Sequence, residues 1–221
     1  VVPRHAGVEV LNAGVAWNNS ELDNGFKYEG DRYKNLENQI DSSQAAFTGG
    51  GMLGYNYQID QIVLGAEADI NYLGFSDDST RNHVWGNGVS SSSKLSFDGD
   101  WYGTLRGRLG YAADNLLFYG TGGLAYGHMQ AKSNIDVSLY DQDATWKGSA
   151  DSVNWGWTIG AGMEYGIDRW SLGVEYLFVD LGSAEWSSNQ GGDYDYALGA
   201  NVKGSVDYQF SVVRATAKLR F

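Results

Sequence analysis

Eight charged residues have the clearest capacity for chemistry in this sequence, and they occur within five short segments. Two carboxylates held close together can act as general acid and general base, and Glu164 and Glu175 fall on segments that we expect to be neighbours. Arg214 and Lys218 are available to neutralise them. We favour buried ion pairs, because an unpaired buried charge is costly. The expected cluster comprises Glu67, Asp69, Arg106, Arg108, Glu164, Glu175, Arg214 and Lys218.

Cysteine and histidine offer little further chemistry. The sequence contains no cysteine, so neither a disulfide nor a thiolate metal site can form. Its three histidines are His5, His83 and His128. His128 with Ser133 could imitate the histidine–serine pair of a lipase or acyltransferase. We interpret His128 as an interfacial residue instead, and we expect no enzymatic activity.

The acidic residues suggest cation binding only weakly. Asp141 and Asp143 are two residues apart, as are Asp193 and Asp195, but neither pair completes a calcium-loop motif. We therefore expect no metal site and no cofactor. The net charge of −12 argues against nucleic acid as a partner. It also suggests the hypothesis that acidic loops hold divalent cations that bridge to lipopolysaccharide phosphates. A melting temperature unchanged by EDTA would contradict that hypothesis.

The charged residues belong to segments with a strict period of two, which is typical of extended strands. In residues 155–167, apolar or aromatic residues alternate with small or polar ones. The apolar face is long enough to cross a bilayer, which takes a tilted strand about 9–11 residues. The residues expected to face lipid on this segment and the next are Trp155, Trp157, Ile159, Tyr165, Trp170, Leu172, Tyr176 and Phe178. The predicted strands are 8–18, 45–58, 62–72, 101–111, 116–128, 155–167, 170–178 and 213–221.

The connections between these segments alternate in length. Turn-forming residues join three pairs of strands at hairpin spacing, at 59–60, 114–115 and 168–169. The other four connections are long and polar: 19–44, 76–98, 132–151 and 182–205. This layout predicts an all-β protein, an eight-stranded antiparallel up-and-down transmembrane β-barrel with three short periplasmic turns and four long extracellular loops. We expect one domain over residues 1–221, with both termini in the periplasm and any signal peptide already removed.

The placement of charge decides which face of the barrel is expected outside. If Arg106 and Arg108 faced acyl chains, each would cost about 2–4 kcal/mol near the bilayer midplane. The alternative is a soluble β-barrel or sandwich with an apolar core and these charges in water. An eight-stranded barrel, however, has an interior that side chains just fill. A whole face of tryptophan and tyrosine would be too bulky there, so we expect the small and polar face inside.

Several strands also resemble those of a known family. Residues 100–111, DWYGTLRGRLGY, resemble the D-W-x-G-T-x-R-x-R-x-G-Y strand of small alphaproteobacterial outer-membrane proteins. Residues 119–127, 157–165 and 170–182 resemble their next strands, and Val213–Arg214 with Arg220–Phe221 resembles their closing strand. These are the OmpA-like, porin-family outer-membrane β-barrel proteins of rhizobia, brucellae and bartonellae. The first loop, 19–44, is longer and more charged than that pattern.

The resemblance implies a bacterial outer membrane and a C-terminal Phe221 that is read by the barrel-assembly machinery. We expect a structural barrel that maintains envelope integrity and presents surface loops. One alternative is a narrow passive pore for small solutes. Another is a surface receptor or adhesin, such as one that binds haem near His83 and Trp85. The expected partners are outer-membrane lipids, lipopolysaccharide and the assembly machinery, with lateral packing or homo-oligomerisation in the membrane as a further expectation.

Overall fold

The chain forms strands throughout nearly all of its described length. The computed structural model describes residues 6–18, 21–28, 31–32, 38–41, 45–85, 89–139, 142–191 and 201–220. Among these residues, no helix is long and apolar enough to cross a membrane. The strands are β1 Ala6–Asn18, β2 Glu21–Tyr28, β3 Asp31–Arg32, β4 Asn38–Asp41, β5 Ala45–Ile59, β6 Ile62–Trp85, β7 Val89–Ala113, β8 Leu116–Leu139, β9 Gln142–Ile167, β10 Trp170–Gly191 and β11 Asn201–Arg220.

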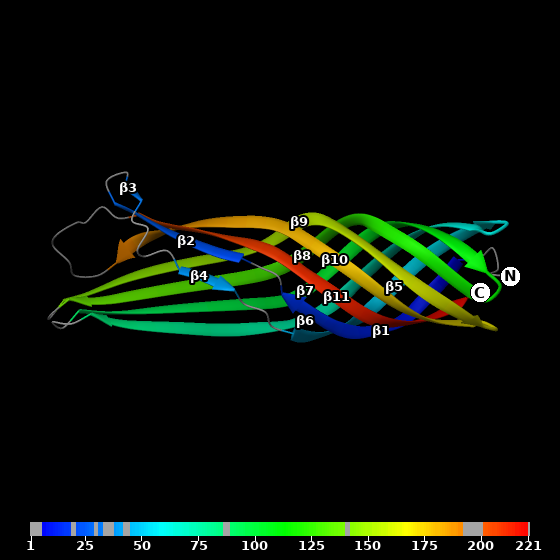
Figure 1. Cartoon of the computed structure of the whole chain (residues 1–221), viewed down its shortest axis with the longest axis horizontal. Coiled ribbons are helices and arrows are strands. Elements are labelled where there is room, and N and C mark those ends of the chain that lie inside the picture. The colour runs from blue at the N-terminus through cyan, green and yellow to red at the C-terminus, as the bar shows by residue number, and fades with distance from the viewer. Residues whose placement is uncertain are drawn as a thin grey trace.

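Eight of these strands close into a ring, as the sequence predicted. The order is β1-β5-β6-β7-β8-β9-β10-β11, every pair is antiparallel, and β11 pairs back onto β1 from Gly7↔Arg220 to Asn18↔Phe210. Closure leaves no sheet edge inside the barrel wall, as a strand protein in lipid requires. The result is a long tube with both ends of the described chain at the same end (Figure 1).

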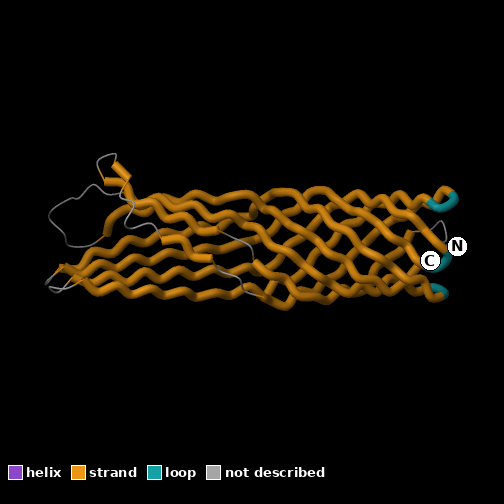
Figure 2. The backbone as a smooth tube through the Cα atoms, in the orientation of Figure 1, coloured by secondary structure: helices purple, strands orange, loops and turns teal. Residues whose placement is uncertain are grey.

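Two-residue turns close one end of the tube: those at 114–115 and 168–169 are where the sequence predicted them, and the first, at 60–61, is one residue later than predicted. Asp60, Asp114 and Asp168 each adopt a positive φ, of 51°, 53° and 50°. Aspartate tolerates this left-handed conformation better than most residues, because its short polar side chain can hydrogen-bond locally. The three turns lie together at the end that also holds both ends of the described chain (Figure 2).

At the other end the long polar connections lie as predicted, but much of their length is strand rather than loop. Strands β6 and β7 stay paired from Ser76↔Asp98 to Trp85↔Val89, and β8 and β9 stay paired up to Leu139↔Gln142. Part of the first predicted loop is strand β2, which pairs with β11. Residues 76–83 of β6 have no apolar face and gave no strand signal, whereas the alternation of Ile135, Val137 and Leu139 in β8 was overlooked. A hairpin that continues an existing ladder, however, needs no buried face of its own.

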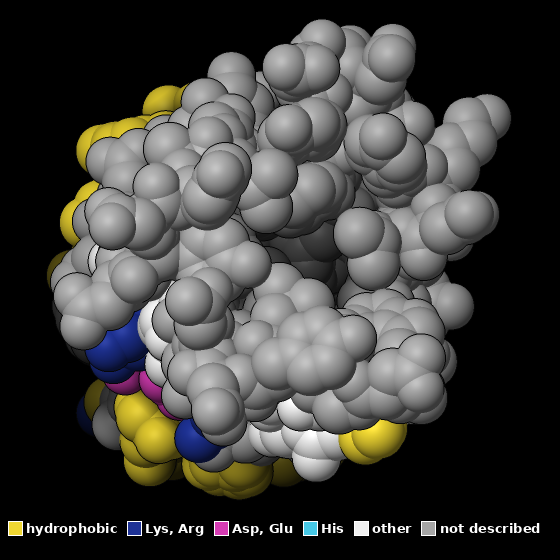
Figure 3. Space-filling model, turned by 90° about the vertical axis from the view of Figure 1, so that its left-hand side faces the viewer, with side chains coloured by type: hydrophobic (Ala, Val, Ile, Leu, Met, Phe, Trp, Pro, Cys, Tyr) yellow, Lys and Arg dark blue, Asp and Glu magenta, His cyan; other side chains and the backbone are white. Residues whose placement is uncertain are grey.

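The two faces of the barrel wall differ in the exposure of their side chains. Of the eight residues expected to face lipid, seven are exposed on the outer face, and Phe178 is half-buried against Trp157 with ring centroids 5.5 Å apart. Looking along the tube from the hairpin end, hydrophobic side chains appear on its outer rim (Figure 3). Aromatic residues stand near both ends of this band: Trp101, Tyr126 and Trp155 toward the hairpins, and Tyr57, Tyr111, Tyr165 and Trp170 toward the turns. Such aromatic girdles mark the two membrane interfaces of outer-membrane barrels.

Spin labels at two neighbouring positions would test this orientation. Leu172 is 52% exposed and Ser171 is 3% exposed. In lipid vesicles, we expect a nitroxide on Leu172→Cys to collide readily with oxygen, which dissolves in lipid, and rarely with a water-soluble nickel chelate. A nitroxide on Ser171→Cys should be shielded from both reagents. Greater exposure of the Leu172 label to the nickel chelate than to oxygen would contradict this orientation.

Candidate functional site

The eight charged residues of the predicted cluster converge inside the barrel. They come from β6, β7, β9, β10 and β11, and each is at most 7% exposed. Alternation places them on the inner face, and register makes some of them direct cross-strand neighbours, such as Glu67↔Arg106 and Glu175↔Arg214. The strands therefore bring together charges that lie up to 151 positions apart in the sequence.

Four of these residues form a first square in which every cation contacts both anions. Arg106 lies 2.9 Å from Asp69 (Nη2 to Oδ2) and 3.0 Å from Glu175 (Nη1 to Oε1). Arg214 lies 3.0 Å from the same Asp69 oxygen, and its Nη2 lies 2.6 Å from Glu175 Oε2. Its Nε also donates to Glu175 Oε2 at 2.8 Å. Such pairing is what makes charges tolerable in a buried site.

A second square lies nearer the short turns. Glu67 Oε1 is 2.7 Å from Arg108 Nη1 and 2.9 Å from Lys218 Nζ. Glu164 contacts the same two cations: it accepts a hydrogen bond from Arg108 and lies 2.8 Å from Lys218 Nζ. One contact joins the squares, between Arg106 Nη2 and Glu67 Oε2 at 3.4 Å.

Tyr119, on β8, contacts a residue of each square. Its ring lies under the Arg108 guanidinium, whose Cζ is 3.6 Å from the ring centroid, and this is the geometry of a cation–π interaction. Its hydroxyl donates to Glu175 Oε1 of the first square at 3.1 Å. The charge cluster had been predicted from alternation, but Tyr119 was missed. Its inward position in the β8 alternation was the available signal.

The arrangement is electrically balanced, with four carboxylates and four cations, which gives a net charge of zero. Glu164 and Glu175 belong to different squares, and cations hold both. Their geometry therefore supports ion pairing rather than acid–base chemistry. What the cluster does is fill the bore: its side chains cross the lumen between opposite walls, as the pairing of β7 residues with Glu175 and of β11 residues with Asp69 shows.

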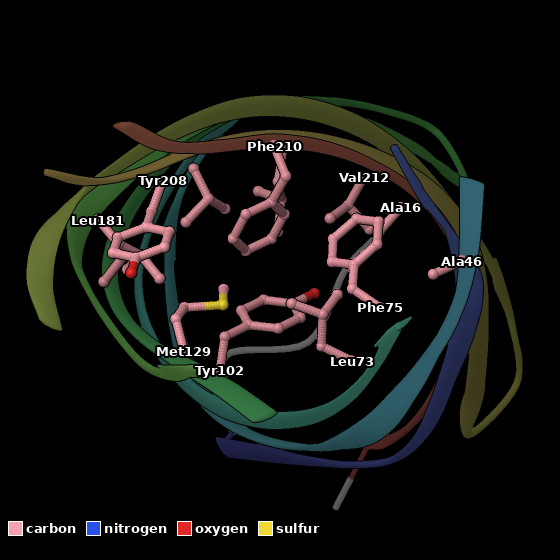
Figure 4. Packing of buried hydrophobic residues seen from close by; sticks show 13 residues of the cluster. Ala16, Ala46, Leu73, Phe75, Tyr102, Met129, Leu181, Tyr208, Phe210 and Val212 are labelled. Carbon is pink, nitrogen blue, oxygen red and sulfur yellow. The ribbon is translucent and has the colours of Figure 1, made fainter. Parts of the chain in front are cut away.

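A packed apolar layer lies on the hairpin side of the charges, and the sequence interpretation missed it. The expectation of a small and polar interior was incomplete, because Leu73 and Phe75 continue the inward alternation of Asp69 into an apolar stretch of β6. Tyr102 and Phe210 pack edge to face with centroids 5.2 Å apart. Figure 4 shows these rings meeting inside the strands. The layer comprises Ala16, Ala46, Leu73, Phe75, Tyr102, Ala125, Met129, Leu177, Val179, Leu181, Tyr208, Phe210 and Val212.

The remaining candidates form no second site in the described part of the chain. His128 Nδ1 lies 3.0 Å from Asp100 Oδ2 near the hairpin-side aromatic girdle. Nothing is described of the side chains of Ser133, His83 and Trp85. His5, Asp141, Asp193, Asp195 and Phe221 lie outside the described residues. Across the described ranges, no group of three or more histidine, aspartate or glutamate residues could hold a metal ion.

Removing one cation should destabilise the barrel strongly. Arg106→Met leaves Asp69 and Glu175 with one buried partner fewer, and breaking a buried ion pair costs about 3–5 kcal/mol. Arg169→Met removes an arginine from an exposed turn and should change stability by less than about 0.5 kcal/mol. Urea unfolding in vesicles, followed by tryptophan fluorescence, measures both. Equal stability of the two variants would contradict a structural role for the charge cluster.

Comparison with known proteins agrees with this architecture. The model of the outer membrane protein beta-barrel domain family matches residues 4–211. A 31 kDa outer-membrane immunogenic protein of Brucella melitensis is 37% identical over 78% of this chain and 69% of its own length. A 22 kDa outer membrane protein of Rhizobium leguminosarum is 34% identical over 66% of this chain and 57% of its own. The fold is similar to that of OprG from Pseudomonas aeruginosa, with a TM-score of 0.50, 15% identity and coverage of 99% and 97% of the two chains. The chain belongs to the family of outer-membrane β-barrel proteins of the Gram-negative envelope.

Proposed function

We propose that this protein is a closed structural barrel that anchors long β-hairpins in the bacterial outer membrane, and that it carries out no catalysis. The proposal rests on one observation: two layers of side chains fill the lumen. The balanced charge cluster crosses the bore, and the apolar layer packs directly above it. Eight strands leave an interior just wide enough for side chains. This filling supports a rigid anchor more than a passive pore.

The same proposal includes an orientation. Bacterial outer-membrane barrels carry short turns on the periplasmic side and longer segments outside. Here the three two-residue turns and both ends of the described chain share one end of the tube, and the long hairpins extend from the other (Figure 1). The hairpins β6–β7 and β8–β9 would then project from the cell, with the termini in the periplasm.

The hairpins are the part of the barrel that would meet partners outside the cell. The similar Brucella melitensis protein is named an outer-membrane immunogenic protein, which suggests that hairpins of this kind meet the host. In this chain the hairpins are polar and continue the strands of the barrel. The charge cluster holds those same strands in place further down the barrel. Their partners at the membrane would be lipids and lipopolysaccharide. The barrel-assembly machinery would insert the chain.

Conductance in planar bilayers separates the proposed anchor from the pore. We expect the wild-type protein to show no steady single-channel current, because the charge cluster and the apolar layer each fill the bore at a different depth. Phe210→Ala thins only the apolar layer, so it too should stay closed. A steady wild-type current that changes in Arg106→Ala would favour the passive pore.

Epitope tags would test the orientation. A tag placed between β6 and β7 should bind antibody on intact cells, because that hairpin is proposed to be external. A tag in the Asp168–Arg169 turn should bind only after the outer membrane is permeabilised. The opposite pattern would overturn the orientation, and both variants should first show the heat-dependent gel mobility of a folded barrel.

A further inference from the structure

The exposed cations of the barrel gather on one side of its hairpin end. Among the residues whose side chains the structure describes, the exposed lysines and arginines are Lys94, Lys132, Lys147 and Arg169. Arg169 lies in a short turn. The three lysines lie beyond the aromatic girdle on the neighbouring strands β7, β8 and β9, and we call them the lysine patch. Basic side chains stand beside hydrophobic ones on the outer rim at this end (Figure 3).

Strand register brings the three lysines close to one another. Lys94 pairs with Asn134, and Asn134 pairs with Lys147, so these three residues form one row across the strands. Lys132 precedes Asn134 by two residues and is exposed on the same face. It is therefore the diagonal neighbour of Lys94 and of Lys147, at about 7–8 Å. Because a lysine ammonium sits on a flexible stem of four carbons, all three can turn toward one anion.

The positions between the lysines carry further hydrogen-bond donors. Ser96 and Ser149 pair with Lys132 from its two sides and complete a second row. The amide of Asn134 stands in the middle of the first row. Each of the six side chains in these two rows can donate a hydrogen bond, and none of them is a carboxylate. Together the two rows form a surface suited to the oxygens of a phosphate.

The carboxylates described on the same three strands border these rows. Toward the girdle, Asp98 is half-buried, and Asp100 Oδ2 lies 3.0 Å from His128 Nδ1. Toward the hairpin tips, Asp136 Oδ1 accepts a hydrogen bond from Thr145 Oγ1 at 2.8 Å. The acidic residues thus lie at the two ends, and the positive charge is concentrated between them.

The height of the patch above the girdle indicates which phosphate it would meet. Lys132 follows Tyr126 of the girdle by six residues, which is about 20 Å along the strand. At a strand tilt of about 35–45°, the patch stands about 14–16 Å above the girdle. The headgroup layer of a phospholipid bilayer reaches only about 5–7 Å beyond the hydrocarbon. A phosphate carried on a sugar stands further out, and so fits this height better.

The same three strands carry a shallow hollow on the outer side of the wall, closer to the bilayer centre. Gly107, Gly120 and Gly122 line it between Leu109 and Ile159. A Cβ on any of these glycines would meet no atom of a neighbouring strand closer than 3.5 Å, so the packing of the wall does not require glycine there. Gly122 precedes Tyr126 by four residues, which places the hollow about 9–11 Å below the girdle. That depth lies within the outer half of a hydrocarbon core about 30 Å thick, where an acyl chain could fill the hollow.

We propose that the lysine patch and the hollow together bind one molecule of a phosphorylated glycolipid of the outer leaflet. The patch holds a phosphate by direct charge-assisted hydrogen bonds, and the hollow receives one of the acyl chains. The inference rests on the orientation proposed above, which places the hairpins on the outer side of the membrane. It differs from the hypothesis of bridging divalent cations, because here ammonium groups contact the phosphate themselves.

Native mass spectrometry of the folded protein in a zwitterionic detergent tests this site. The probes are lipid A with its phosphates, the same lipid A without phosphates, and phosphatidylglycerol. We expect one molecule of phosphorylated lipid A to bind at least about tenfold more tightly than either other probe, because hydrogen bonds to charged groups are strong. EDTA should leave this binding unchanged. Equal binding of all three probes would overturn the proposal, and loss of binding in EDTA would contradict direct contact by lysine.

Three substitutions identify the parts of the site. Lys132→Gln removes the central charge and should weaken binding of phosphorylated lipid A about tenfold. Arg169→Gln removes the exposed cation of the short turn and should bind like the wild type. Gly122→Leu fills the hollow and should weaken both forms of lipid A several-fold. Equal binding by Lys132→Gln and Arg169→Gln would overturn the lysine patch, and unchanged binding by Gly122→Leu would overturn the hollow. Each variant should first show the heat-dependent gel mobility of a folded barrel.

The lipid site and the proposed function fail in different ways. A conducting wild-type barrel, or tags that report the opposite orientation, would reject the proposed function whatever the lipid binding in detergent. A closed barrel with external hairpins that binds phosphorylated lipid A no better than phosphatidylglycerol would reject only the lipid site.

Discussion

The structure depends on charge neutrality among eight buried side chains inside the barrel. Four anions and four cations cross the bore in two linked squares, and each charged group faces more than one opposite charge. Removing a charge from water costs several kcal/mol, and only close pairing offsets that cost. The cluster is therefore acceptable only if all five contributing strands are in register. A shift of one residue in any of them would turn its charges toward lipid.

This constraint explains how the interior is divided. The charges occupy the part of the barrel nearer the turns, where the strands are held most closely by two-residue hairpins. The apolar layer occupies the part nearer the long hairpins, where β10 bends and loses ladder pairs. Apolar side chains tolerate such irregularity better than ion pairs do, because their attraction does not depend on direction. The strand ladders are thus most regular around the charge cluster, because its ion pairs require exact positions of both partners.

Much of the barrel could be predicted from the sequence because lipid imposes a simple rule. Residues such as Ile159 and Leu172 must alternate with Glu164 and Ser171 once one face meets hydrocarbon, so strands, turns and the charge cluster were all visible. Beyond the membrane that rule no longer applies. The paired residues Ser76 to His83 have no apolar face, so they were taken for loop. The apolar layer was missed for the opposite reason: Phe75 and Phe210 are apolar residues on the inner face, where alternation alone predicts polarity.

The pairing of β1 with β11 has a consequence for the order of assembly. Neighbouring strands elsewhere in the ring are joined locally, but the Gly14↔Arg214 pair joins the two ends of the chain, and so carries the largest loss of chain entropy. Arg214 and Lys218 also arrive with this last strand. Until it docks, Asp69, Glu67, Glu164 and Glu175 lack two of their four cations. Ring closure and charge neutralisation therefore coincide, because a ring without β11 leaves the four carboxylates with only Arg106 and Arg108.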